Sequence, residues 1–414
     1  PLRPVIFIPG ILGSILVEQD DPNDEIWGSY FDMLFSNLFG KGFDKLYLDP
    51  GEYKLNGDEN GIQTLHYSGK NKIVSKSVME RVGLSKLFVV DASDDIGIYR
   101  TFLNLLRKDL GYGDQKRGVD DLFFFHYDWR LDNAENAIKL AEDIVEWKER
   151  YIDYVEKIYP EYGKPDVKFN IIAHSMGGII AMYYALKLEG LQDIGKLFLI
   201  ATPLQGSMVT VKALKDGEDI GFALYVPKHI AMSFPALYQM LPDYDTAFVD
   251  ESGKEIAKNI YDLESFENWV GFPEKNEKIG SSDQQEFDEF IHKAIKQAKH
   301  VRDAISLAKL QTAAEGEKID VLIIRSDCDE TLFRAIVEKN ELMIPIKNVN
   351  FDGLRSHVSG DGRVPSTDLK DLKRSAYISL IYDCGNGHAY VMEKSITVQN
   401  SILRALLPEG HFGQ

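Results

Sequence analysis

Short runs of apolar residues recur along the chain, with turn residues between them. These runs do not alternate polar and apolar positions as a half-solvated sheet would, so we expect strands that helices cover on both faces. Between several runs lie amphipathic patterns, the clearest over residues 133–158, where apolar positions recur at intervals of three and four. The expected strands lie at residues 5–8, 122–125, 167–173, 196–201, 321–325 and 376–382. This order predicts an α/β fold with a mostly parallel central sheet flanked by helices.

Two segments break this alternation. Residues 18–95 follow the first strand and are rich in turn residues and acidic side chains. Residues 206–315 hold loops and then a long amphipathic pattern that begins near Phe287. Neither segment offers a clear core strand. We therefore expect one domain over residues 1–414, with both segments inserted above the sheet and the second forming a cap or lid.

Composition narrows the range of functions. The chain carries 65 acidic and 47 basic residues, a net charge of −18, which argues against nucleic acid as a partner and against electrostatic docking on anionic lipid. Hydrophobic residues make up 44%, enough for a globular core. No apolar run approaches the ~20 residues that span a bilayer. We expect a soluble protein, cytoplasmic or secreted, and the pattern leaves its oligomeric state open.

A serine stands between an expected strand and an expected helix. The stretch Ala173-His174-Ser175-Met176-Gly177 resembles the G-x-S-x-G turn that presents a nucleophilic serine, with alanine in place of the first glycine. Small residues suit this turn because strand and helix cross closely there. The alternative is a serine whose hydroxyl only caps the helix. The pattern favours Ser175 as a nucleophile.

A nucleophilic serine needs a base and an acid that orients the base. In this type of fold the acid and then a histidine follow the serine along the chain. His388 and Asp361 lie in glycine-rich loops associated with late strands, and we expect them to be the base and the acid. Asp327 or Asp329, which follow a strand directly, are the alternative acid. His174 is next to the serine, and we expect it to point elsewhere.

The oxyanion of an acyl-transfer intermediate needs backbone donors. One is expected from Met176, the residue after the nucleophile. The other is expected from Ile11, in the loop after the first strand, where Gly10 lets the backbone approach a substrate. The alternative for this loop is an ordinary Pro-Gly turn.

Taken together, these stretches resemble the lecithin:cholesterol acyltransferase-like α/β-hydrolases. The resemblance spans Val5 to about Leu406, loosely in the two inserted segments. It implies a serine hydrolase or acyltransferase of glycerolipids or phospholipids with a mobile lid and no cofactor. It also implies that Asp128 and Arg130 form a structural ion pair that ties the core to the lid, with contact to the substrate as the alternative. The sequence departs from the family in Ala173 and in lacking the dense disulfides of animal members, so sterol specificity is not implied. The shared stretches are IPGILGS (8–14), YDWR (127–130), AHSMGG (173–178), ATPLQGS (201–207), GDGRVP (360–365) and GNGH (385–388).

Apolar residues near these stretches are candidates for contact with substrate or with a lipid surface, and packing against the cap is the alternative. The candidates are Leu12, Trp27, Phe31, Phe234 and Leu237. The acidic groups lack the ordered spacing of a calcium loop, so we expect solvated turns and no metal. Cys328 and Cys384 both follow strands, and whether they pair is open.

The sequence thus predicts a serine ester hydrolase of the lipase, esterase or phospholipase A type that needs no cofactor. Ser175, His388 and Asp361 are expected to carry the reaction on acyl esters of lipids. An acyltransferase with the same three residues is the first alternative. The second is a hydrolase-fold protein that binds without turnover.

Overall fold

The structure is a computed structural model. It describes residues 2–28, 42–70, 73–82, 96–114, 118–221, 224–256, 259–272, 284–351, 354–369, 372, 375–384 and 387–407. Phe31 and parts of both inserted segments lie outside these residues.

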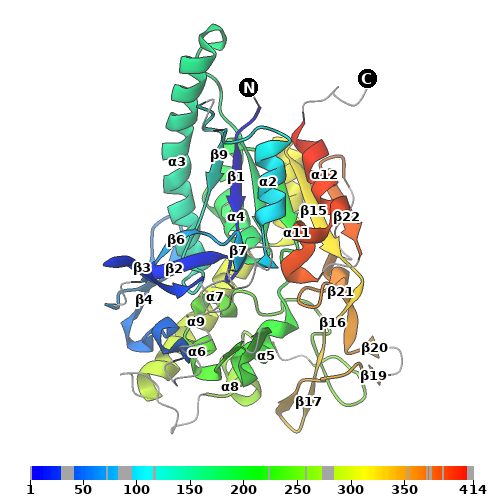
Figure 1. The fold of residues 1–414 in the computed structure, drawn as a ribbon. Coiled ribbons are helices and arrows are strands. Elements are labelled where there is room, and N and C mark those ends of the chain that lie inside the picture. The colour runs from blue at the N-terminus through cyan, green and yellow to red at the C-terminus, as the bar shows by residue number, and fades with distance from the viewer. Residues whose placement is uncertain are drawn as a thin grey trace, which may run out of the picture.

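A parallel sheet forms the centre of the molecule (Figure 1). Within the described residues it has six strands in the order β22-β15-β11-β10-β1-β9, and every neighbouring pair is parallel. This arrangement confirms the predicted fold class. The strands are β1 (Val5–Ile8), β9 (Leu122–Phe124), β10 (Phe169–His174), β11 (Ile194–Ile200), β15 (Asp320–Ser326) and β22 (Ile378–Asp383).

Helices cover both faces of this sheet, which explains the unbroken apolar runs. Ile6 and Ile8 of β1 pack in the core that includes α3 (Asn133–Ile158) and α4 (Met176–Lys187). Val5 and Phe7 pack in a second core. That core is closed by α2 (Arg100–Lys108), α11 (Val391–Lys394) and α12 (Ile396–Leu406). Burying each such apolar side chain contributes about 1.5–3 kcal/mol.

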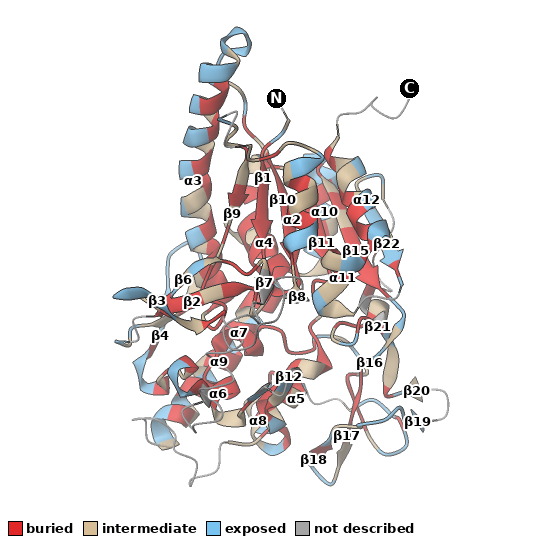
Figure 2. Ribbon diagram, in the orientation of Figure 1, coloured by how far each residue is buried: buried red, intermediate tan, exposed pale blue. Residues whose placement is uncertain are grey.

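The first inserted segment forms small antiparallel sheets beside the core (Figure 2). β2 (Ser14–Glu18) lies between β3 (Asp21–Trp27) and β6 (Ile73–Val78). β4 (Tyr53–Gly57) and β5 (Gln63–Tyr67) form a hairpin that contacts α3 and α9 (Gln284–Ala304), a helix of the second inserted segment. β7 (Arg81–Val82) and β8 (Ile96–Gly97) form a short pair that precedes α2.

The second inserted segment lies below the sheet in Figure 1. Its long amphipathic pattern is α9 (Gln284–Ala304), whose apolar face is buried from Phe287 to Val301. The next helix, α10 (Leu307–Glu317), contacts α4 and so belongs to the layers around the sheet. The remaining elements are α5 (Met208–Asp216), β12 (Glu218–Gly221), β13 (Leu224–Val226), α6 (Lys228–Met232), α7 (Pro235–Tyr238), β14 (Phe248–Val249) and α8 (Leu263–Trp269).

A third excursion separates β15 from β22, and its short strands were not predicted. β16 (Asp329–Leu332) pairs antiparallel with β21 (His357–Gly360), and β21 leads directly to Asp361. Between them lie β17 (Ala335–Glu338), β18 (Glu341–Met343), β19 (Asn350–Phe351) and β20 (Leu354–Arg355).

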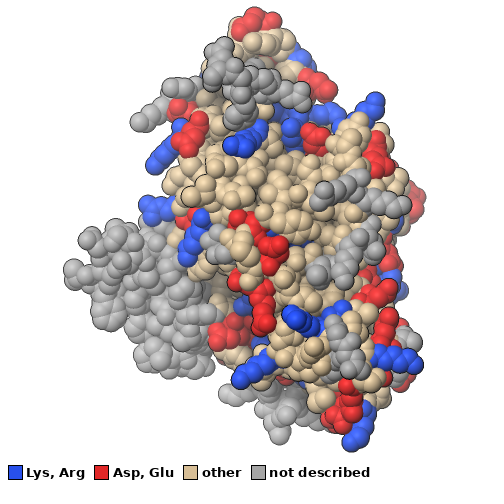
Figure 3. Space-filling model, turned by 90° about the vertical axis from the view of Figure 1, so that its right-hand side faces the viewer, with Lys and Arg blue, Asp and Glu red and all other residues tan. Residues whose placement is uncertain are grey.

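On the face shown in Figure 3, acidic and basic side chains are interspersed. Among the helices that the structure describes, none combines the length and the apolar character that crossing a bilayer requires.

Candidate active site

Ser175 occupies the turn that joins the central strand β10 to α4. Its backbone has φ 51° and ψ −126°, a conformation that residues with a side chain rarely adopt. Its amide donates to the carbonyl of Ile200 at 2.8 Å, and its carbonyl accepts from Gly178 at 2.9 Å. The residue is 4% exposed. The surrounding packing therefore holds a strained turn in place at the end of a buried strand.

Glycines make the close crossing at this turn possible. A Cβ atom on Gly177 would collide with the carbonyl oxygen of Pro9, and one on Gly178 would collide with the Thr202 side chain. Gly10 is equally close, because a Cβ there would lie 2.8 Å from the Cβ of Ser175. The loop after β1 thus lies directly against the serine.

His388 connects Ser175 to Asp361. Its Nε2 lies 2.8 Å from Ser175 Oγ, and its Nδ1 lies 2.8 Å from Asp361 Oδ2. The His388 amide also donates to the Asp361 carbonyl at 2.9 Å. The structure therefore brings the three predicted residues into one line of hydrogen bonds, although Ser175 and His388 are 213 residues apart.

Asp361 is suited to remain ionised beside His388. The residue is 2% exposed. Burial raises the pKa of its carboxyl, but His388 and the amides of Val364 and Arg363 outweigh this effect, so the pKa lies below its usual value. The two amides donate to Oδ1 at 2.7 and 2.9 Å, which leaves Oδ2 for the histidine.

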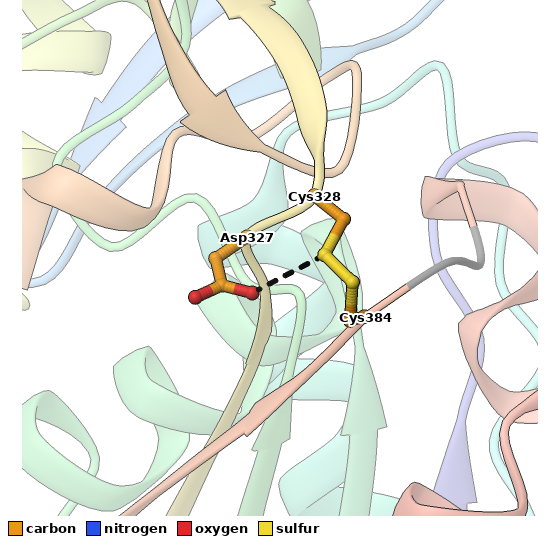
Figure 4. Close-up of a disulfide and its surroundings, with 3 residues drawn as sticks. All are labelled: Asp327, Cys328 and Cys384. Carbon is orange, nitrogen blue, oxygen red and sulfur yellow. Dashed lines mark hydrogen bonds between the residues drawn. A yellow bond between two sulfur atoms is a disulfide. The ribbon is translucent and has the colours of Figure 1, made fainter.

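The two alternative acids lie elsewhere. Asp327 is exposed, and its Oδ1 lies 3.7 Å from the sulfur of Cys328 (Figure 4). Asp329 begins β16, where it pairs with Gly360. The structure thus shows a hydrogen bond to His388 from Asp361 but from neither of these two alternatives.

Cys328 and Cys384 form a disulfide, with their Cα atoms 5.1 Å apart (Figure 4). Cys384 directly follows β22 and precedes His388 by four residues, whereas Cys328 lies between β15 and β16. The bond therefore joins the segment that carries His388 to the start of β16, whose partner strand β21 leads to Asp361. Within the described ranges, the one grouping of potential metal ligands is Asp327 with these two cysteines, whose sulfurs the disulfide uses.

Two tyrosine hydroxyls hold the loop after β1 in place, one at Pro9 and the other at Gly10. Tyr127 Oη donates to the Pro9 carbonyl at 2.8 Å, and the Gly10 amide donates to Tyr99 Oη at 3.0 Å. Among the described residues, neither the Ile11 amide nor the Met176 amide donates to another backbone group. Ile11 is half-buried and Met176 fully buried. The role of both amides as oxyanion donors stays a prediction.

The ion pair implied by the resemblance is present. Asp128 Oδ2 lies 2.6 Å from Arg130 Nη2, and both side chains are buried. Arg130 also donates from Nη1 to the Leu46 carbonyl at 3.1 Å. It therefore ties the core to the first inserted segment.

Trp129, which the sequence reasoning did not single out, is the centre of a buried aromatic group. The rings of Trp27 and Phe234 meet it edge-on, with ring centroids 5.4 and 5.8 Å away. The Trp27 indole donates to the Leu12 carbonyl at 2.8 Å. Leu237 is 8% exposed. The group thus packs between the core and the two inserted segments, and its role in substrate binding stays a prediction. The role of Phe31, which lies outside the described residues, also stays a prediction.

Comparison with known proteins gives three findings. The family model described as "Lecithin:cholesterol acyltransferase" matches residues 24–318, a range that includes Ser175 and ends before Asp361. The curated protein "Lecithin-cholesterol acyltransferase-like 4" of Arabidopsis thaliana is 29% identical over 187 residues. Those residues are 43% of this chain and 29% of the relative, so the match spans less than a third of its length.

The third finding is a solved structure titled "The crystal structure of Tle4-Tli4 complex". One of its chains is 16% identical, covers 98% of this chain over 98% of its own length, and has a TM-score of 0.57. This likeness concerns the fold alone.

Proposed function

The chain belongs to the lecithin:cholesterol acyltransferase family, and on that premise we propose that it is a serine hydrolase that cleaves acyl esters of lipids. The observation that carries the proposal is the line of hydrogen bonds from Ser175 through His388 to Asp361. A serine in a strained turn, a histidine on its hydroxyl and a buried carboxylate on that histidine are the groups that acyl transfer requires.

The first half of the reaction forms an acyl-enzyme. His388 Nε2 accepts the proton of Ser175 Oγ while this oxygen attacks the ester carbonyl carbon. Asp361 accepts from Nδ1–H and stabilises the imidazolium that results. The Ile11 and Met176 amides donate to the oxyanion. The C–O bond of the leaving alcohol then breaks, and the imidazolium protonates the alcohol oxygen.

The second half releases the acyl group. His388 takes a proton from the incoming hydroxyl, whose oxygen attacks the acyl-enzyme carbonyl. When the tetrahedral intermediate collapses, the imidazolium returns the proton to Ser175 Oγ. With water as acceptor, the product is a fatty acid.

We propose that the buried apolar group between core and cap contributes to the binding of acyl chains. Leu12 adjoins Ile11, a proposed oxyanion donor, and the Trp27 indole holds its carbonyl. The proposal extends to Phe31, Phe234 and Leu237. Such a site binds esters with acyl chains more tightly than small polar esters, because burial of apolar substrate surface against apolar side chains contributes to the free energy of binding.

The second candidate function is acyl transfer to a lipid alcohol, and the family match favours it. The chemistry is the same until the acceptor enters, and a site that excludes water favours an alcohol. Product analysis with and without added lipid alcohol separates the two, because the transferase yields a new ester and the hydrolase yields fatty acid.

The experiment that tests the proposal measures hydrolysis of p-nitrophenyl esters from short to long acyl chains. We expect turnover that is highest for medium or long chains and that falls about a millionfold in Ser175→Ala. Ser401→Ala, at a half-buried serine of α12 whose hydroxyl donates to the Thr397 carbonyl, is the matched control. Activity that survives in Ser175→Ala contradicts the nucleophile. If the protein neither turns over an ester nor reacts with a serine-directed phosphonate, it is a binding protein instead.

A further inference from the structure

His174, the residue before the serine, lies at the junction of three segments that are distant in the sequence. Its Nδ1 is 2.8 Å from Tyr99 Oη, and its Nε2 is 3.2 Å from the carbonyl oxygen of His388. Tyr99 Oη accepts in turn from the Gly10 amide at 3.0 Å. Tyr99 and His174 are 2% and 4% exposed, so solvent does not compete for these bonds.

The partners fix the direction of every bond in this chain. The His388 carbonyl can only accept, so His174 Nε2 carries the hydrogen. A neutral imidazole has one N–H, so Nδ1 accepts from the Tyr99 hydroxyl, whose oxygen remains to accept from Gly10. Burial and the neighbouring His388 lower the pKa of His174 to about 3, which keeps the ring neutral near neutral pH. One tautomer of one residue therefore satisfies all three bonds.

The two ends of the chain of bonds are parts of the proposed machinery. Gly10 precedes Ile11, whose amide is a proposed oxyanion donor. His388 is the proposed base, and its ring centroid lies 5.2 Å from that of His174. A rotation of the His388 backbone would move Nε2 away from Ser175 Oγ. A rotation of the peptide group at Gly10 would change the direction of the Ile11 N–H.

We propose that His174 is a positioning residue. Together with Tyr99, it fixes the loop after β1, which carries the Ile11 amide, relative to the segment that carries His388. This inference rests on the proposed function, since it assigns a role within the same site. Displacement of reacting groups by about 1 Å can cost a hundredfold in rate, so small shifts at either end suffice.

A second contact joins the start of α2, which follows Tyr99, to the segment that carries His388. Glu393 of α11, five residues after His388, accepts from the amide and hydroxyl of Thr101 at 2.7 and 2.6 Å. Thr101 lies in the first turn of α2, directly after Tyr99 and Arg100. The start of α2 thus contacts the segment that carries His388 directly through Thr101, and Tyr99 is linked to the same segment through His174.

The test compares kcat and KM for a p-nitrophenyl ester and the rate of reaction with a serine-directed phosphonate. In Tyr99→Phe we expect both kcat and the phosphonate rate to fall about 10- to 100-fold at unchanged KM. His174→Asn retains an acceptor near Nδ1 and loses the bond to His388, whereas His174→Gln retains a donor near Nε2 and loses the bond to Tyr99. For each of these two variants we expect kcat and the phosphonate rate to fall by about the same factor as in Tyr99→Phe.

Tyr112→Phe is the matched control, because that hydroxyl is also buried and donates to a backbone carbonyl, that of Arg3, at 3.1 Å. It should lower the melting temperature about as much as Tyr99→Phe and leave kcat unchanged. If wild type reacts with the phosphonate and the Tyr99 and His174 variants react within about threefold of it, this inference is wrong and the proposed function stands. If wild type does not react, both are wrong.

Discussion

The serine and its two partners are held in place by different means. β10 is buried along its whole length, α4 is buried over its first ten residues, and the turn between them packs against glycines. β22, by contrast, lies at an edge of the central sheet in the described residues and is partly exposed. β21, which belongs to a separate two-stranded sheet, is also partly exposed. The acid and base that follow them are held by several separate hydrogen bonds and by one disulfide. The nucleophile is thus fixed by packing that cannot yield locally, whereas its partners are fixed by links that can be removed one at a time.

Removing the acid should have the largest effect. In Asp361→Asn we expect kcat to fall about 10⁴-fold, because an amide neither stabilises the imidazolium nor selects the required tautomer. Steady-state kinetics on a p-nitrophenyl ester measure this loss. Asp327→Asn changes the same type of group at the alternative acid, and an equal loss there would show that the acid has been assigned wrongly.

Removing the disulfide should loosen the acid and base together. For a bond that closes 56 residues, the chain-entropy model gives a loss of about 4 kcal/mol in the free energy of unfolding. We expect Cys328→Ser with Cys384→Ser to show this loss in urea titrations. We also expect kcat to fall while KM is unchanged.

Wild type in the presence of a thiol reductant is the matched comparison for this pair of substitutions. Unchanged kcat in the folded variant would mean that the segments around β21 and β22 keep their geometry without the cross-link.

On the nucleophile's side, one methyl group should be enough to disturb the turn. Gly177→Ala places a Cβ against the Pro9 and Ile8 carbonyls, which are backbone atoms that cannot rotate away. We expect the free energy of unfolding to fall by about 1–3 kcal/mol. Gly316→Ala is the control, since nothing lies within 4 Å of that site in α10 and the change should stabilise the helix by about 1 kcal/mol. Equal stability of the two variants would contradict the close packing.

The last prediction concerns His174, which contacts both the serine turn and the segment that carries His388, and the dependence of stability on pH. Its folded-state pKa is lowered to about 3 by burial and by His388, so below pH ~6.5 the unfolded chain binds a proton that the folded one does not. Its contribution to the free energy of unfolding therefore falls by about 1.4 kcal/mol for each pH unit from about 6.5 toward 3. Urea titrations at pH 7, 6 and 5 on wild type and His174→Gln should show a steeper decline in wild type. Parallel declines would exclude a buried neutral imidazole.

The sequence predicted most where the information is local. The apolar runs located the strands of the sheet, because burial on both faces leaves a pattern in each strand separately. Ser175 was found from five consecutive residues. Asp361 and His388 were found because chain order in this type of fold limits where the acid and base can lie, and the structure brings both to Ser175.

What the sequence did not reveal depends on distances between remote residues. Whether Cys328 and Cys384 pair was open, because spacing along the chain does not give their separation. Tyr99 is 75 residues from His174, and no local pattern marks a tyrosine that bonds to a histidine. The strands β16 and β21 were not predicted for the same reason. Each is only four residues long, and it is a strand because it pairs with the other, which lies far away in the sequence.

The order of the chain has a consequence for synthesis. β22 pairs with β15 at one edge of the sheet, and His388 follows it, so the base leaves the ribosome 213 residues after Ser175. At ordinary rates of translation this interval lasts about 10 to 40 s. During that time the nascent chain contains Ser175 but lacks His388, the proposed base. The ester cleavage that we propose therefore requires that the last strand has been added to the sheet.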